Sequence, residues 1–205
     1  FQQLKDKASE LISMNTGIFS NIPIDIDLFA EFLGLDIIPS PGFKNSVARD
    51  AFLSPCSKEI YVDQDLQLNP KFECKYRFAI SHEIAHYHLH TDYYKSLITG
   101  SPSYEDWIKI YQRIPEEHLS LFEYQANVVG ACVLIPDHHL DNYFDDALKL
   151  FEERINLAKT SGIERRAYLG YVIDGIANKI SSKFNVSVQA MTLRFKDYKY
   201  EDRIQ

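Results

Sequence analysis

The spacing of apolar residues along the chain predicts a mostly helical protein with a small sheet in its N-terminal third. A repeat of three to four residues predicts helices at roughly 3–15 and 26–33. The apolar run at 35–38, which Pro and Gly residues follow, predicts a strand. Two further apolar stretches, 46–53 and 59–62, flank a Ser-Pro-Cys-Ser turn and predict an antiparallel hairpin. The sheet is therefore expected to be small and antiparallel.

Two longer helices are predicted after this hairpin. In the first, an apolar stripe runs from Phe78 to Leu89. In the second, the stripe covers residues 122–133, and Pro136 ends the helix. The segment between them, about 102–117, is expected to be a connection with a short helix, and the alternative is a wall of a substrate site.

The C-terminal half is expected to be helical. Residues 137–139 are expected to start a loop, and amphipathic segments near 144–159 and 163–183 predict helices beyond it. With 205 residues, 45% of them hydrophobic, the chain can bury a good core. We therefore expect a main domain at 1–140 and a helical region at 141–205 that packs on it or forms a small helix-turn-helix-like appendage.

The C-terminal segment bears on nucleic-acid binding. The formal net charge of −7 argues against a general nucleic-acid binder, whose affinity comes from clustered Lys and Arg. Basic residues do gather between 179 and 199, and the turn before Ser187 is typical of half a helix-turn-helix. We favour a last helix that Ser187 caps, with Val188, Met191 and Phe195 packed inward and its Lys and Arg in solvent. Direct nucleic-acid binding is thus not expected, although the sequence does not exclude it.

The cysteines and the lengths of the apolar runs indicate the compartment. Cys56, Cys74 and Cys132 are too few and too scattered for a disulfide framework, so reduced thiols in the cytoplasm are expected. No run approaches the roughly 18–20 apolar residues of a membrane span, and the first residues are not typical of a signal peptide. The chain begins with Phe1 rather than Met, so an upstream DNA-binding segment stays open.

The most informative local pattern is His-Glu-x-x-His at residues 82–86. On a helix, four residues rotate by about 400° and advance by about 6 Å, so His82 and His86 project from one face and can share a metal ion. A zinc ion held by two neutral imidazoles and one carboxylate keeps a fourth position for water and lowers the pKa of that water toward neutrality. Glu83 would then take the proton as general base. The alternative is a chance match to a short pattern.

A third ligand must come from another part of the chain. His90 lies about 12 Å beyond His82 along a helix axis, too far to share one zinc ion with it, and Asp92 stands where a longer pattern needs His. Glu123 is the best candidate, because an unpaired carboxylate is costly within its mostly apolar helix. Asn127, one turn further on the same face, is placed to hydrogen-bond a ligand imidazole. The alternative is an exposed Glu on an amphipathic helix.

Taken together, these motifs resemble those of the ImmA/IrrE-type metallopeptidases. In that family, Arg-Phe-x-x-x-His-Glu-x-x-His-x-x-x-His is followed by Glu-x-x-Ala-Asn and by Leu-Ile-Pro or Leu-Met-Pro. The matching residues here are Arg77, Phe78, His82, Glu83, His86, His90, Glu123, Ala126, Asn127, Leu134, Ile135 and Pro136. Similar segments near 22–34 and 184–195 extend the resemblance over most of the chain. One departure is Gln125, where many relatives carry a second acidic residue.

The resemblance implies an α+β fold with a zincin-like (gluzincin-type) metallopeptidase core, made of a small antiparallel sheet, an active-site helix and a helical C-terminal half. It implies one Zn²⁺ per chain, with His82, His86 and Glu123 as ligands and Glu83 as general base, and Mn²⁺ is the alternative metal. It further implies a regulatory endopeptidase that acts on few protein targets, typically a helix-turn-helix repressor of the Xre type. Transcription regulation or a stress response would lie downstream.

Two questions stay open at the level of sequence. A tyrosine often stabilises the oxyanion in such a site. Tyr61, Tyr87 and Tyr124 lie near the motifs, but the sequence does not indicate which tyrosine has this role. The second functional class is a non-catalytic, metal-containing regulator that binds a repressor or DNA. Glu83 favours the peptidase, because a purely structural metal site needs no carboxylate beside its first ligand.

Overall fold

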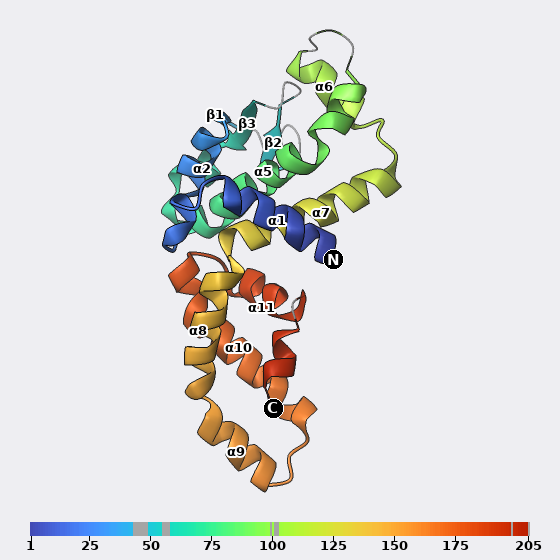
Figure 1. Ribbon diagram of the computed structural model, residues 1–205. Helices are drawn as coiled ribbons and strands as arrows, with labels where there is room; N and C mark the ends of the chain where they lie inside the picture. Colours follow the sequence, from blue (N-terminus) through green and yellow to red (C-terminus); the bar gives the residue numbers. More distant parts are fainter. Residues whose placement is uncertain (43–48, 55–57, 99, 101–102, 198, 205) are drawn as a thin grey trace. The chain divides into compact units, whose positions relative to one another are not determined.

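Helices make up most of the described chain, and a three-stranded sheet lies in its N-terminal part (Figure 1). The computed structural model describes residues 1–42, 49–54, 58–98, 100, 103–197 and 199–204. By their internal contacts the residues divide into two units, Phe1–Leu134 (unit 1) and Ile135–Gln205 (unit 2). The predicted functional division into 1–140 and 141–205 stays a prediction.

Unit 1 carries the sheet, and its longest helices are α5 and α7. Its elements in chain order are α1 (Gln2–Met14), η1 (Ile18–Ser20), α2 (Ile26–Phe32), β1 (Asp36–Ser40), β2 (Ala51–Leu53), β3 (Glu59–Asp63), α4 (Gln64–Leu68), η2 (Pro70–Phe72), α5 (Glu73–Ser96), α6 (Tyr104–Tyr111) and α7 (Glu116–Leu134). The short helix α6 confirms the helix expected in the connection between the two long helices.

The sheet has the order β1-β3-β2 and is mixed, so the predicted antiparallel sheet is wrong in one pairing. β2 pairs antiparallel with β3, which confirms the described part of the hairpin. The start of the predicted strand, 46–48, and three turn residues, 55–57 with Cys56, lie outside the described residues. β1 pairs parallel with β3 on the other side. An apolar pattern identifies a strand but not its direction, which the path of the chain decides.

The helices α5 and α7 form the centre of unit 1. α5 packs against α7 and also against β2 and β3. The predicted stripe on α7 is confirmed at Ala126, Val129 and Val133, which are fully buried, while Phe122 is half-buried. On α5 the predicted stripe is only partly correct, since Phe78 and Leu89 are half-buried while Ile84 is fully buried. The face of α5 that carries the histidines therefore lies against α7.

Unit 2 is helical throughout its regular elements. They are α8 (Asp137–Lys149), α9 (Glu152–Thr160), α10 (Arg165–Phe184), α11 (Val188–Asp197) and the 3-10 turn η3 (Tyr200–Arg203). α10 packs against α8, α9 and α11. Phe144, Phe184 and Phe195 are among the largest fully buried side chains and belong to this small core.

Residues 137–139 form the first turn of α8, so the predicted loop there is wrong. Pro136 takes an extended conformation, with ψ of 139°, and is the N-cap of α8 directly after α7 ends. Leu140, Phe144 and Ala147 then bury one face of the new helix. A proline marks the end of a helix in sequence, but the same residue also suits the start of the next one because no N–H is required there.

The last helix, α11, begins as predicted. The N–H of Ala190 donates to the Oγ of Ser187 at 3.1 Å, which confirms Ser187 as the cap. Met191 and Phe195 are fully buried, as expected for the inward face. Val188 is 36% exposed, however, so the expectation that it packs inward is wrong. Its place in the first turn leaves it at the rim of the core.

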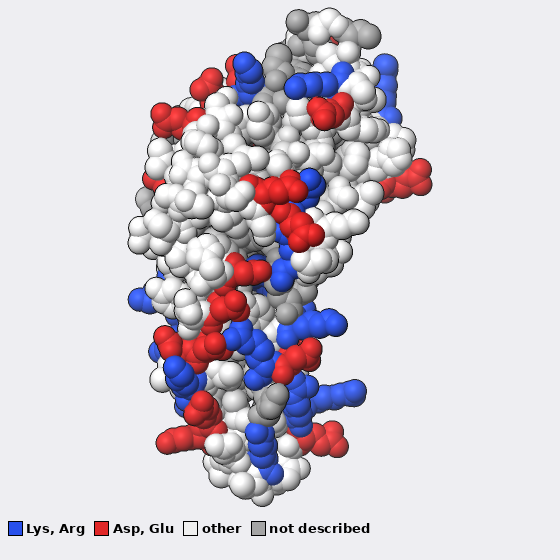
Figure 2. Space-filling model, in the orientation of Figure 1, with Lys and Arg blue, Asp and Glu red and all other residues white. Residues whose placement is uncertain are grey.

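Several charged side chains of unit 2 form ion pairs with one another. Arg194, expected in solvent, is 1% exposed, donates to the carbonyl oxygen of Ile135 at 3.2 Å and forms an ion pair with Asp137. Arg203 pairs with Asp141 at 2.7 Å. On the face in Figure 2, Lys and Arg are interspersed with Asp and Glu over the elements of unit 2, whereas more of unit 1 is uncharged. This face presents no extended area of one sign.

Among the described residues, no single helix is both long and apolar enough to span a membrane.

Candidate metal centre

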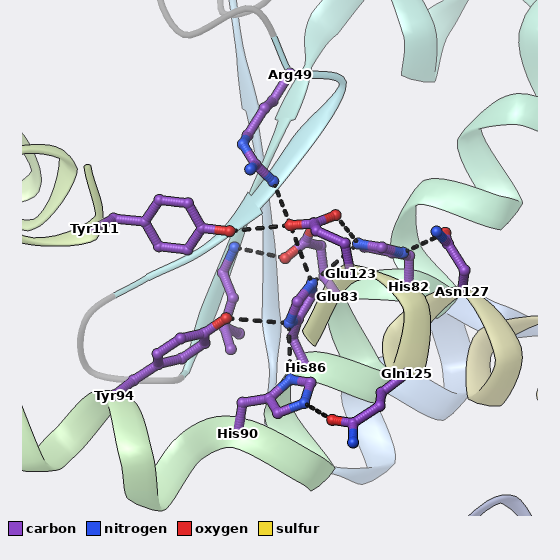
Figure 3. Close-up of polar contacts among 11 residues, drawn as sticks. Arg49, His82, Glu83, His86, His90, Tyr94, Tyr111, Glu123, Gln125 and Asn127 are labelled. Atoms are coloured by element: carbon purple, nitrogen blue, oxygen red, sulfur yellow. Dashed lines mark hydrogen bonds and ion pairs between the residues drawn. The ribbon is translucent and has the colours of Figure 1, made fainter. Parts of the chain in front are cut away.

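Two helices bring the three predicted ligands together. α5 supplies His82 and His86, and α7 supplies Glu123 (Figure 3). The Nε2 atoms of the two histidines lie 3.0 Å apart. Nε2 of His82 lies 3.2 Å from Oε2 of Glu123, and Nε2 of His86 lies 3.7 Å from Oε1. One ligand atom from each residue lies within 4.8 Å of the others.

These distances fit a small tetrahedral cation. Ligand bonds of about 2.0–2.1 Å in a tetrahedron place neighbouring ligand atoms about 3.3–3.4 Å apart. The 3.0 Å between the two Nε2 atoms and the 3.2 Å between Nε2 of His82 and Oε2 of Glu123 lie close to that value, whereas the 3.7 Å from His86 is measured to the other oxygen, Oε1. The donor set of two imidazole nitrogens and one carboxylate oxygen leaves a fourth tetrahedral position for another group. The residues present therefore fit a zinc ion or a similar divalent metal.

The close packing of α5 on α7 has a local cause in Gly130. A Cβ built at Gly130 would lie 3.1 Å from the backbone nitrogen of His82 and 3.2 Å from the carbonyl carbon and oxygen of Ser81. The Oγ of Ser81 donates to the carbonyl oxygen of Gly130 at 2.8 Å, so a hydrogen bond joins the helices at the same point. The absence of a side chain at Gly130 thus lets α7 approach the backbone beside the first histidine.

Asn127 lies where the sequence places it, beside the first histidine. Its Oδ1 is 3.0 Å from Nδ1 of His82. An amide oxygen accepts, so Nδ1 of His82 carries a hydrogen, and Nε2, which faces Glu123, is the nitrogen available to a metal ion. The contact holds the orientation of the ring as well as its tautomer.

Glu83 faces the sheet from the same helix. It is 4% exposed, and its Oε2 accepts a hydrogen bond from the N–H of Leu53 on β2 at 2.9 Å. Burial is the main cause of a raised pKa at Glu83, and the nearby charge of Glu123 adds to it, while His82 and Arg49 oppose it. A carboxylate with a raised pKa binds a proton more strongly than an ordinary one.

His82 and Glu123 each shift the pKa of the other. Burial lowers the pKa of His82, but the hydrogen bond to Glu123 and the charges of Glu83 and Glu123 offset this, so the pKa is raised. Burial alone would raise the pKa of Glu123, yet the hydrogen bond from His82 and the charge of Arg49 hold it well below the usual value. His86 has a pKa well below its usual value, mainly because it is buried. Glu123 is therefore a carboxylate that attracts a cation to this point.

The structure adds two contacts with Glu123 that the sequence did not reveal, from Arg49 and from Tyr111. Nη1 of Arg49 lies 2.9 Å from Oε1 of Glu123, and the hydroxyl of Tyr111 donates to the same oxygen at 2.9 Å. The guanidinium of Arg49 also lies over the ring of Tyr111, 4.9 Å from its centroid. No local pattern could reveal this set, because Arg49 precedes β2, Tyr111 ends α6 and Glu123 is on α7.

Tyr94 and Tyr111 contact the ligands, and neither is one of the three tyrosines nearest the motifs in sequence. Tyr124 is 51% exposed, and Tyr61 donates to Glu59. Tyr94 instead lies 3.1 Å from Nδ1 of His86, and Tyr111 contacts Glu123. Position in the sequence was thus a poor guide to which tyrosines meet the site.

A small cavity adjoins the centre between α5, α6 and β2. Glu83, His86, Phe52 and Trp107 are among the residues that line it. Its solvent-reachable volume is about 10 Å³, which is roughly the room that one water molecule needs. The connecting segment therefore does form a wall beside the site, through Trp107 of α6.

Comparison with known families gives one finding. The family model of the IrrE N-terminal-like domain, Peptidase_M78, matches residues 30–196. The match includes all the residues of the centre and ends at residue 196, within α11. No curated protein matches the chain.

Proposed function

Since this chain belongs to the M78 peptidase family, which the IrrE N-terminal-like domain defines, we propose that it is a zinc-dependent endopeptidase with a zincin-like (gluzincin-type) core. The observation that carries the proposal is the convergence of His82, His86 and Glu123 within 4.8 Å, with the buried Glu83 beside them. Two imidazoles and a carboxylate suit Zn²⁺, and Mn²⁺ is the alternative occupant.

In the proposed mechanism, His82, His86 and Glu123 hold the metal. The bound ion supplies a Lewis acid that polarises a peptide carbonyl and lowers the pKa of nearby water. Glu83 takes a proton from the attacking water and passes it to the leaving amide nitrogen. The N–H of Leu53 holds Oε2 of Glu83 at 2.9 Å, so Oε1 is the oxygen that handles this proton.

Several side chains support the ligands in this proposal. Asn127 orients His82 through the contact of 3.0 Å. Arg49 and Tyr111 hold Oε1 of Glu123 and so leave Oε2 directed at the first histidine. Tyr111 also lines the cavity beside Glu83, which makes it a better candidate than Tyr61, Tyr87 or Tyr124 for contacting a substrate carbonyl.

We propose a regulatory role in the cytoplasm, with a specific protein as substrate. The resemblance to ImmA/IrrE-type enzymes favours a helix-turn-helix repressor of the Xre type, and transcription regulation or a stress response would follow from its cleavage. The low number of cysteines supports a reducing compartment.

The test compares Glu83→Gln with the unchanged chain. Both proteins are loaded with zinc, their metal content is measured by elemental mass spectrometry, and each is incubated with extract of the source cells. New protein N-termini are then identified by terminal labelling. We expect about one zinc per chain in both, and cleavage slower by about 10²–10⁴-fold in Glu83→Gln, because the amide cannot take the proton.

Glu117→Gln is the matched control, since Glu117 is exposed in the first turn of α7, away from the ligands. It should cleave like the unchanged chain. Equal cleavage by Glu83→Gln would contradict the mechanism. Zinc-loaded protein that generates no new termini in any sample would favour the non-catalytic regulator that binds a repressor or DNA.

A further inference from the structure

A line of hydrogen bonds runs from α7 through α5 to the second histidine of the centre (Figure 3). Oε1 of Gln125 lies 2.9 Å from Nε2 of His90. Nδ1 of His90 lies 2.9 Å from Nδ1 of His86. His86 and His90 are each 3% exposed, so water does not readily replace these contacts. Nε2 of His86, at the end of the line, faces His82 and Glu123.

Each contact in the line constrains the next. A neutral imidazole has one N–H and one lone pair, so a contact between two ring nitrogens needs one of each. The amide oxygen of Gln125 accepts, and therefore Nε2 of His90 carries its hydrogen. Nδ1 of His90 then presents a lone pair and accepts the N–H at Nδ1 of His86. His86 is left with its lone pair on Nε2, the atom that faces the other two ligands.

If every donor and acceptor in this line were exchanged, His86 could not bind a metal ion through Nε2. If the amide nitrogen of Gln125 donated, His90 would carry its hydrogen on Nδ1 and donate to Nδ1 of His86. The hydrogen of His86 would then be on Nε2 and point at His82 and Glu123, where a metal ligand needs a lone pair. The hydroxyl of Tyr94, 3.1 Å from Nδ1 of His86, does not choose between the two directions because a hydroxyl can donate or accept.

We propose that Gln125 and His90 are positioning residues that set the tautomer of His86 and so prepare its Nε2 for the metal. The inference rests on the metal site of the proposed function, but not on peptidase activity. It also explains how one helix supports both histidines: Asn127 orients His82 directly, while Gln125 acts on His86 through the intervening His90. His90 thus serves the site without being a ligand.

The test uses the full chain with Gln125→Met and Gln125→Glu. Met has nearly the length of Gln but no strong acceptor, whereas Glu keeps an acceptor oxygen at the same place. Zinc affinity is measured by competition with a chelator. The histidine tautomers of the metal-free proteins are read from long-range proton–nitrogen NMR spectra of chains labelled with ¹⁵N-histidine.

We expect Gln125→Met to weaken zinc binding by about 10–100-fold and to shift His86 and His90 away from the Nδ1–H and Nε2–H forms. Gln125→Glu should keep both tautomers and at least the original affinity. Gln112→Met, a change of an exposed glutamine, is the matched control and should alter nothing. Thermal unfolding of the metal-free proteins shows whether Gln125→Met has lost its fold, and Gln125→Glu provides the second comparison.

Unchanged tautomers and affinity in a folded Gln125→Met would overturn the inference, as would loss of the His86 Nδ1–H form in Gln125→Glu. Neither result depends on cleavage. A chain that binds zinc as described but cuts no protein would contradict the proposed function and leave the tautomer inference intact.

Discussion

At the scale of single residues, Glu123 is the meeting point of the centre. Its Oε1 accepts from Arg49 and Tyr111, each at 2.9 Å, and its Oε2 faces His82 at 3.2 Å. Its side chain is 30% exposed, so it is neither a deeply buried charge nor a freely solvated one. A carboxylate held by two donors on one oxygen is fixed in orientation, which suits a ligand that binds metal through the other oxygen.

Glu123→Ala should remove a ligand and also leave Arg49 without its carboxylate. We expect zinc affinity to fall by more than the roughly 10–100-fold typical of a supporting residue. Tyr111→Phe is the graded comparison, because it removes only the hydroxyl and keeps the ring beneath Arg49; it should weaken binding by about 10-fold. Chelator competition measures both. If Glu123→Ala bound zinc like the unchanged chain, the third ligand would have to be another residue.

Some residues of the site could be predicted from the sequence and others could not. The sequence identified His82, His86, Glu123 and Asn127, and the structure brings their ring and side-chain atoms together. Their roles as ligands and support stay proposals. Arg49 escaped prediction because it meets Glu123 only through folding, across 74 positions of sequence. No periodicity connects residues so far apart.

At the scale of elements, the site depends on how closely α5 and α7 approach. Glu123, Gln125 and Asn127 all lie on α7, and their partners are on α5. Since a contact of 3.0 Å tolerates little displacement, a small separation of the helices would affect every one of these contacts together. At Gly130 a side chain would collide with the backbone of α5, because a Cβ there would lie 3.1–3.2 Å from atoms of Ser81 and His82.

Gly130→Ala should therefore weaken both the fold and the site. The new Cβ would lie 3.1–3.2 Å from backbone atoms of Ser81 and His82, which cannot move without shifting α5. Overpacking of this kind costs about 1–3 kcal/mol, and the higher helix propensity of Ala returns up to about 1 kcal/mol. We expect a net loss of about 1–2 kcal/mol in the free energy of unfolding, measured with denaturant, together with weaker zinc binding.

Gly170→Ala is the control for this change. Gly170 lies in α10, and a Cβ built there meets nothing within 4 Å. Substitution should be neutral or stabilise by up to about 1 kcal/mol through helix propensity. Were Gly130→Ala to stabilise the protein as well, close packing at Gly130 could not be what holds the two helices in place.

Element prediction succeeded where the signal was local. The cap of α11 illustrates this: the predicted Ser187 accepts from the N–H of Ala190 at 3.1 Å. It failed at α8, where Pro136 both ends one helix and begins another. It predicted the strand β1 but not its direction, because parallel pairing with β3 depends on the path of the chain between the two strands.

At the scale of the whole molecule, every residue of the candidate centre belongs to unit 1. The family match nevertheless runs from residue 30 to 196 and so covers most of unit 2 as well. Unit 2 has its own buried core of aromatic residues. Metal binding should therefore stabilise one unit directly, while the family domain as a whole includes both.

Hydrogen exchange of the full chain, with and without zinc, tests this division. A ligand at 100 times its Kd stabilises the state that binds it by about 2.7 kcal/mol, which slows exchange of the amides that open with the site. We expect the added protection to be confined to peptides within 1–134, above all α5 and α7. Equal protection throughout 135–205 would mean that the two units open together.

The sequence by itself determined the local parts of this protein. The spacing of His82 and His86 places them on one face of any helix, and apolar periodicity with caps defines most helices, because these depend only on neighbours a few residues apart. Tertiary structure decided the parallel pairing of β1, the ion pair between Arg49 and Glu123, and the hydrogen bonds that join Gln125, His90 and His86. These contacts join distant segments, and packing selects them from many partners that a linear pattern leaves equivalent.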